Sequence, residues 1–134
     1  MGCYNTGLGS FQKWAIGNVV RNILLENEDI KKQVKDNIYP VVAPEVTKGD
    51  FILYRRTQYS KSSVKMGVYE DRCELTLLVV SDNYDNSFAL ASKIDNVLNG
   101  RHNIDEKRVD IMLSDSSEGW EDNKYIQTLT YIIK

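Results

Sequence analysis

The sequence predicts an α+β fold, with helices packed on one face of a mainly antiparallel β-sheet. Helical and strand patterns follow one another in the order α-α-β-β-α-β-β, and no internal repeat or linker divides the chain. Its 134 residues, 42% hydrophobic and 27% charged, are typical of one globular domain with one core. We therefore expect a single domain over residues 11–134, preceded by a flexible leader over residues 1–10.

The N-terminal part of this domain is expected to form two helices. A helical pattern begins near Phe11, and Asn27 is placed to cap a second, shorter helix that has acidic residues in its first turn. Pro40 and Pro44 force the residues before them into extended geometry, so a short strand or connector follows. The apolar stripe of the first helix consists of Ile16, Val19, Val20, Ile23 and Leu24.

Four strands are expected where β-branched, aromatic and alternating apolar residues gather. Strand 69–80 is apolar on both sides only in its second half, which predicts burial on both faces there. In strand 108–114, Val109, Ile111 and Leu113 alternate and are expected to point inward. The other two strands are expected at 51–59 and 125–133.

A third helix is expected between the second and third strands, with Phe88, Ala91, Ile94 and Val97 on one face. Asn99-Gly100 ends it, because glycine commonly follows a helix in the left-handed conformation. The polar segments 60–67 and 115–123 are predicted as loops.

Residues that usually carry chemistry are sparse in this chain. His102 is the only histidine and lies in a predicted loop, so no nucleophile–histidine pair is evident. Cys3 and Cys73 are too few and too far apart in sequence for a zinc site or a disulfide framework, and they fit a reducing compartment. No phosphate-binding glycine motif follows a predicted strand. The sequence therefore predicts no enzyme, no cofactor and no metal centre.

The acidic segment after strand 69–80 is the best candidate for a metal site. Asp82, Asn83, Asp85 and Asn86 supply oxygen ligands, but Tyr84 interrupts the alternate positions that a calcium loop requires, and the loop glycine is missing. We favour the interpretation that these side chains cap the following helix. A small enzyme or metal protein centred on Asp82 and Asp85 remains an alternative.

Two groups of residues are candidates for interaction with partners. Basic side chains gather in the predicted hairpin at 55–65, although the formal net charge of −2 is unlike that of a general nucleic-acid binder. They form either a solvated face or a site for a polyanion, so a nucleic-acid-binding module is the alternative function. Aromatic residues that border loops are expected at contacts. The candidates are Arg55, Arg56, Lys61, Lys65, Tyr59, Trp120 and Tyr125.

Targeting signals do not change this interpretation. The N-terminal MGCYNT matches the myristoylation pattern at Gly2 and Thr6, but so short a pattern often matches by chance. No apolar run is long enough to span a bilayer, and no charged and apolar regions mark a signal peptide. We therefore expect no membrane partner.

Several phrases resemble a phage and prophage family of tail-completion, or tail-terminator-like, proteins. The segment LLENEDIKKQVKDNIYPVVAPE (24–45), with Ile38, Tyr39, Pro40 and Pro44, is similar to the opening of that family. FILYRRT, ELTLLVVSDNYDNSFALASKIDNVLNG and YIQTLTYIIK continue the resemblance, which covers about 17–133, mostly in the order of elements. The leader 1–16 and the segment 114–124 have no counterpart that we can place in the family.

This resemblance implies a non-catalytic structural protein of virion assembly. Members of the family are thought to form homo-oligomeric rings, often hexamers, at the head–tail junction, where they join the tail-tube protein to the connector. It implies a location in the bacterial cytoplasm during assembly and then in the virion tail. Nucleic acid would meet the chain only by passage through the lumen of the ring.

Overall fold

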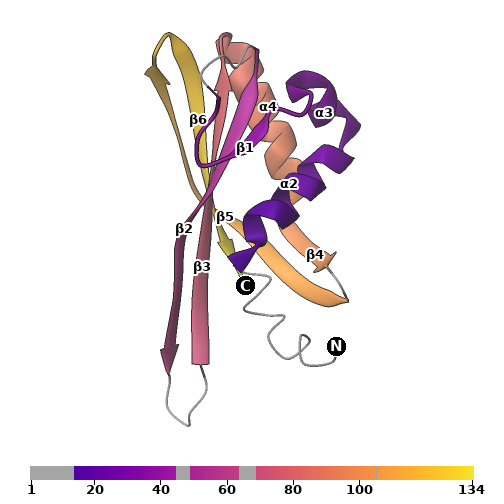
Figure 1. The fold of residues 1–134 in the computed structure, drawn as a ribbon, viewed down its shortest axis with the longest axis vertical. Helices are drawn as coiled ribbons and strands as arrows, with labels where there is room; N and C mark the ends of the chain where they lie inside the picture. Colours follow the sequence, from indigo (N-terminus) through magenta and orange to yellow (C-terminus); the bar gives the residue numbers. More distant parts are fainter. Residues whose placement is uncertain (1–13, 45–48, 64–68, 105) are drawn as a thin grey trace.

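The computed structural model describes residues 14–44, 49–63, 69–104 and 106–134, and shows helices on one side of a twisted sheet (Figure 1). Within these residues, six strands form one sheet in the order β1-β2-β3-β6-β5-β4. β1 pairs with β2 in parallel, and every other pairing is antiparallel. The predicted α+β fold with a mainly antiparallel sheet is therefore confirmed.

The bounds of the elements follow the predicted order, with β1 at the short strand or connector expected near Pro40 and β4 as an additional strand. The helices are α2 (Ile16–Glu26), α3 (Glu28–Val34) and α4 (Tyr84–Leu98). The strands are β1 (Ile38–Pro40), β2 (Phe51–Ser63), β3 (Tyr69–Ser81), β4 (Gly100–Ile104), β5 (Lys107–Glu121) and β6 (Lys124–Ile133).

The N-terminal helices form where the apolar stripe and the cap predict them. Ile16, Val20 and Leu24 of α2 are buried against the sheet. The Asn27 Oδ1 accepts a hydrogen bond of 3.1 Å from the backbone N–H of Ile30, so Asn27 caps α3 as predicted. The predicted start near Phe11 lies outside the described residues.

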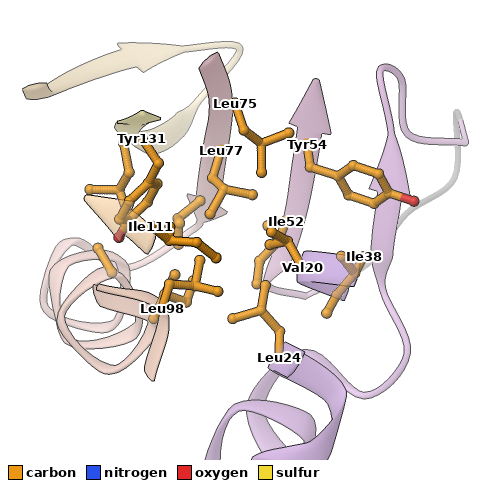
Figure 2. Packing of buried hydrophobic residues seen from close by; sticks show 14 of the residues in the cluster. Val20, Leu24, Ile38, Ile52, Tyr54, Leu75, Leu77, Leu98, Ile111 and Tyr131 are labelled. Atoms are coloured by element: carbon orange, nitrogen blue, oxygen red, sulfur yellow. The ribbon is translucent and has the colours of Figure 1, made fainter. Parts of the chain in front are cut away.

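The core lies between the three helices and the sheet (Figure 2). Alternate residues of β2, β3 and β6 point toward the helices, whose apolar faces meet them. Each fully buried aliphatic side chain contributes about 1.5–3 kcal/mol of transfer free energy, so this one layer of contacts fixes the helices to the sheet. Among the residues that meet there are Val20, Leu24, Ile52, Leu75, Leu77, Leu98, Ile111 and Tyr131.

Three loop predictions were wrong because polar strands lack the apolar alternation that reveals a strand. Residues 60–63, placed in a loop, continue β2. Residues 115–121, also placed in a loop, continue β5, which turns tightly into β6 at Lys124. His102, assigned to a polar loop, lies in β4. Pairing with a neighbouring strand holds these segments in the sheet.

The inward direction predicted for Leu113 was also wrong. Val109 packs against the core and Ile111 is buried, but Leu113 is 37% exposed. The pairing of β5 with β6 shifts between Leu113 and Asp115, where a β-bulge adds one residue to β5. A bulge of this kind redirects the side chains next to it, and no feature of the apolar pattern marks its position.

Candidate interaction surfaces

The acidic segment between β3 and α4 is a helix cap. The Asn83 Oδ1 accepts a hydrogen bond of 3.1 Å from the backbone N–H of Asn86, as the capping interpretation predicts. The Asp82 carboxylate instead forms an ion pair with the Lys124 Nζ, at 2.7 Å, and so connects this corner to the start of β6. Among the described residues, no group of three or more His, Cys, Asp and Glu is placed to hold a metal ion.

A small polar network holds this corner against α3. The buried Ser81 Oγ donates to the Asp50 Oδ1 at 2.7 Å and accepts from the backbone N–H of Asn83 at 3.2 Å. The other oxygen of Asp50 accepts from the Gln33 Nε2 at 2.8 Å. These bonds join α3, the residue before β2, the end of β3 and the cap of α4, so the corner has a structural role.

The predicted basic residues are only partly brought together. The Arg56 guanidinium lies 4.1 Å from the centre of the Trp14 ring, and its Nη1 donates to the Trp14 carbonyl oxygen at 3.0 Å. The Tyr59 ring meets the same tryptophan edge-on, at 5.4 Å between ring centres. Arg55 is exposed. Lys61 lies in β2, and Lys65 is outside the described residues.

A shallow groove of about 280 Å³ opens beside Arg56, between the start of α2 and the edge of the sheet. Trp14 and Val41, exposed by 60% and 63%, bring large apolar surfaces to it. The groove therefore combines apolar side chains with the two arginines. It is lined by Trp14, Ala15, Gly17, Asn18, Pro40, Val41, Tyr54, Arg55 and Arg56.

The end of the molecule that holds the start of α4 carries an exposed aromatic cluster, which consists of Tyr84, Phe88, Trp120 and Tyr125. The Tyr125 ring lies 4.7 Å from Trp120 and 5.5 Å from Tyr84, and Phe88 lies 5.5 Å from Tyr84. Three of the four rings are more than 40% exposed. The predicted Trp120 and Tyr125 thus meet, whereas the predicted Tyr59 lies apart, beside Trp14.

Sequence reasoning missed the helical half of the aromatic cluster. Phe88 was predicted to face the core, but it is 48% exposed. Ser87 is the buried residue of this turn. The available signal was the spacing of Tyr84 and Phe88, four residues apart, which places two aromatic rings side by side on one helix face.

The Glu118 carboxylate is hydrogen-bonded to the aromatic cluster. The Tyr84 hydroxyl donates to Glu118, at 3.0 Å to Oε2, and the Gln127 Nε2 donates to the same oxygen at 2.9 Å. The hydrogen bond to Glu118 and the negative charge of that carboxylate raise the pKa of Tyr84 above its usual value. The hydroxyl therefore stays protonated at neutral pH and keeps α4 tied to β5.

Comparison with known proteins identifies the fold. No family model matches the chain, and no curated protein is detectably similar to it in sequence. Among solved structures, the fold is similar to that of a chain from the virion of a native gene transfer agent particle, with a TM-score of 0.71. The likeness covers 85% of this chain and 89% of that one, at 15% identity. In the part of the chain that the structure describes, no helix is long and apolar enough to cross a membrane.

Proposed function

We propose that this chain is a structural assembly protein of a phage or prophage tail, acting in tail completion or as a tail terminator at the head–tail junction. The observation that carries the proposal is the shared fold with a chain of a gene transfer agent virion, over most of both chains. The resemblance of the segment 24–45 and of the element order to the tail-completion family supports the same class of protein. Its partners would be the tail-tube protein and the connector.

The proposal includes a ring built from copies of one domain, residues 11–134, with residues 1–10 as a leader. The β2–β3 and β5–β6 hairpins extend toward opposite ends of the sheet (Figure 1), so each copy has two different projecting surfaces. Contacts between unlike surfaces of identical chains are heterologous, and they close into a ring when the rotation between copies allows it.

The alternative of a nucleic-acid-binding module gains no support from the described side chains. Arg56 is engaged with Trp14, so of this arginine pair only Arg55 is exposed. Binding of DNA or RNA that falls steeply with salt, and is lost when these four residues become alanine, would restore this alternative.

The test of the proposed function is deletion of the gene from the element that encodes it. We expect purified particles to contain the chain by mass spectrometry, and we expect the deletion to leave heads and tails that fail to join, or tails of abnormal length, in electron micrographs. Supplying the gene in trans should restore normal particles. Particles that lack the chain and assemble normally without its gene would refute the proposal.

A further inference from the structure

The sheet has an incompletely covered strand at each side. Within the described residues, β1 pairs with β2 only from Ile52 to Tyr54, so no other strand adjoins the outer side of β2 at 55–63. At the other side, β4 pairs with β5 only up to Ile111 and the Leu113 N–H donates to the Asn99 Oδ1 at 3.0 Å; among the described residues no strand adjoins the rest of 112–121 on its outer side. The two segments are of nearly equal length. An uncovered strand edge is a template for pairing with another chain.

The two segments carry opposite charge. The segment 55–63 of β2 contains Arg55, Arg56 and Lys61 and no acidic residue. The segment 112–121 of β5 contains Asp115, Glu118 and Glu121 and no basic residue. Opposite charges placed across neighbouring strands stabilise pairing, whereas like charges oppose it. Two copies of the same segment would therefore repel each other, whereas the segment 55–63 of one copy attracts the segment 112–121 of another.

We propose that the 112–121 edge of β5 in one copy pairs, antiparallel, with the 55–63 edge of β2 in the next copy, and that this contact builds the ring. The inference rests on the ring of the proposed function and names its interface. The direction of the strands fits it: β2, β3, β6 and β5 alternate in direction, so β2 and β5 are antiparallel. If neighbouring copies are related by rotation about one axis, β5 of one copy is therefore antiparallel to β2 of the next, and the strand directions continue to alternate across the contact.

The outward backbone groups of β2 limit the possible registers. The Ile52 N–H donates to the Asn37 carbonyl oxygen, and the Tyr54 carbonyl oxygen accepts from the Val41 N–H, both at 2.9 Å and both on the side away from β3. Outward groups recur at every second residue of a strand, so the backbone N–H and C=O of Arg56 also point outward.

The same reasoning assigns the outward groups of β5. Asp110 and Lys134 exchange two backbone hydrogen bonds, of 2.9 and 2.8 Å. Residues of β6 at even spacing from Lys134 therefore form the hydrogen-bonded pairs with β5, and Ile126, paired with Gly119, is one of them. The next residue of β5, Trp120, then points its backbone groups outward.

Placing Trp120 opposite Arg56 aligns the outward groups of the two strands. In this register Glu121 lies opposite Arg55, and both are on the sheet face away from the helices. The bulge of β2 after Arg56 keeps the outward groups in step farther along, where position 61 comes opposite Ser116. In this contact, β1 of the second copy begins where the β5–β6 turn of the first copy ends. Likewise, β4 of the first copy begins where β2 of the second copy ends. The outer strands β1 and β4 therefore limit how far the two edges can slide along each other.

The offset between the two edges suits a closed ring. Measured along the sheet, Trp120 is level with Asp50 of its own chain, so a contact with Arg56 of the next copy displaces the copies by about six residues, or about 20 Å. Four strands of one copy are about 19 Å wide. The strands would then tilt by about 46° to the ring axis, close to the upper end of the range of about 35–45° found in closed barrels.

Cross-linking through paired cysteines tests the register. Arg55→Cys and Glu121→Cys in one chain lie at opposite sides of the sheet, so a disulfide between them must join two copies. They would form a non-hydrogen-bonded pair with Cα atoms about 4.5 Å apart, within the range for a disulfide. Cys3→Ser removes the other thiol of concern, since Cys73 is buried.

We expect mild oxidation of this variant to give a ladder of covalent oligomers. The matched control pairs Arg55→Cys with Gly119→Cys, two residues out of register, at a glycine where a side chain meets no neighbouring atom within 4 Å. The control should cross-link much less. No ladder in either variant, or equal yields in both, would overturn the inference.

Charge exchange provides a second measurement that does not depend on cysteine chemistry. Arg55→Glu and Glu121→Lys should each weaken self-association about tenfold, by native mass spectrometry over a concentration series, because each places like charges opposite one another. The double variant should recover association. Failure of recovery would refute this pairing, whereas particles that lack the chain would refute the proposed function whatever the cross-linking shows.

Discussion

Gly17 is a position where α2 packs directly against a side chain of the sheet. A Cβ atom added at this position would lie 2.6 Å from the Tyr54 ring, which is itself buried. We expect Gly17→Ala to destabilise the protein by about 1–3 kcal/mol, because the overlap outweighs the gain in helix propensity. Urea denaturation measures the change. Gly119→Ala is the control, since its Cβ meets open space, and an equal loss in both variants would contradict the explanation.

Tyr131 makes stability depend on alkaline pH. Burial, and then the hydrogen bond of 2.9 Å to the Asp95 Oδ1 and the charge of that carboxylate, raises the pKa of Tyr131 far above its usual value. In the unfolded chain tyrosine ionises near pH 10. The stabilisation is therefore complete below that pH and is lost as the pH rises further, because only the unfolded state releases the proton.

We accordingly expect the free energy of unfolding to fall between about pH 10 and 11. The fall should be smaller in Tyr131→Phe, which keeps the buried ring but has no proton to release. Denaturant titrations of both proteins at pH 8 and at pH 11 provide the comparison. An identical pH dependence in both would show that another group is responsible.

Single residues differ in how far the sequence predicts them. The caps Asn27 and Asn83 were predictable, because a cap depends on a short local pattern of polar side chain and free backbone N–H. The exposure of Phe88 and Leu113 was not. It depends on how α4 is rotated against the sheet and on a bulge in β5, and both are decided by packing between distant segments.

Elements were predictable in proportion to how much apolar surface they bury. α2, α4, β3 and β6 follow apolar periodicities, which burial against one core imposes. β4 and the outer half of β5 bury little and read as polar loops, although they belong to the sheet. For the aromatic cluster, the sequence identified Trp120 and Tyr125. The charged edges could not be predicted, because which strands lie at the edges of the sheet depends on the strand order.

The cap of α4 carries a prediction for that element. Asn83→Ala should cost about 1 kcal/mol, because the first turn of α4 loses an acceptor for its free backbone N–H. The neighbouring Asp82→Ala removes an ion pair whose carboxylate is 65% exposed, so its cost should stay below about 1 kcal/mol. Thermal unfolding of both variants tests the ranking, and a larger loss for Asp82→Ala would contradict the role assigned to Asn83.

For the whole molecule, the distribution of charge sets the response of assembly to salt. The net charge is only −2, yet the two open edges carry opposite charges at opposite sides of the sheet. We expect self-association to weaken between about 0.05 and 0.5 M salt, because attraction between exposed charges is screened over about 10 Å at 0.1 M. Sedimentation velocity measures it. Association that strengthens over this range would indicate an apolar contact instead.

Both open edges also contain a β-bulge, after Arg56 in β2 and after Leu113 in β5. A bulge twists a strand and interrupts its row of hydrogen-bonding groups, which makes it a poor template for an ordinary flat strand. A chain that has not met its partner is thereby a poorer template for pairing with other exposed strands. The same irregularity restricts these edges to a partner strand whose hydrogen-bonding groups follow their course.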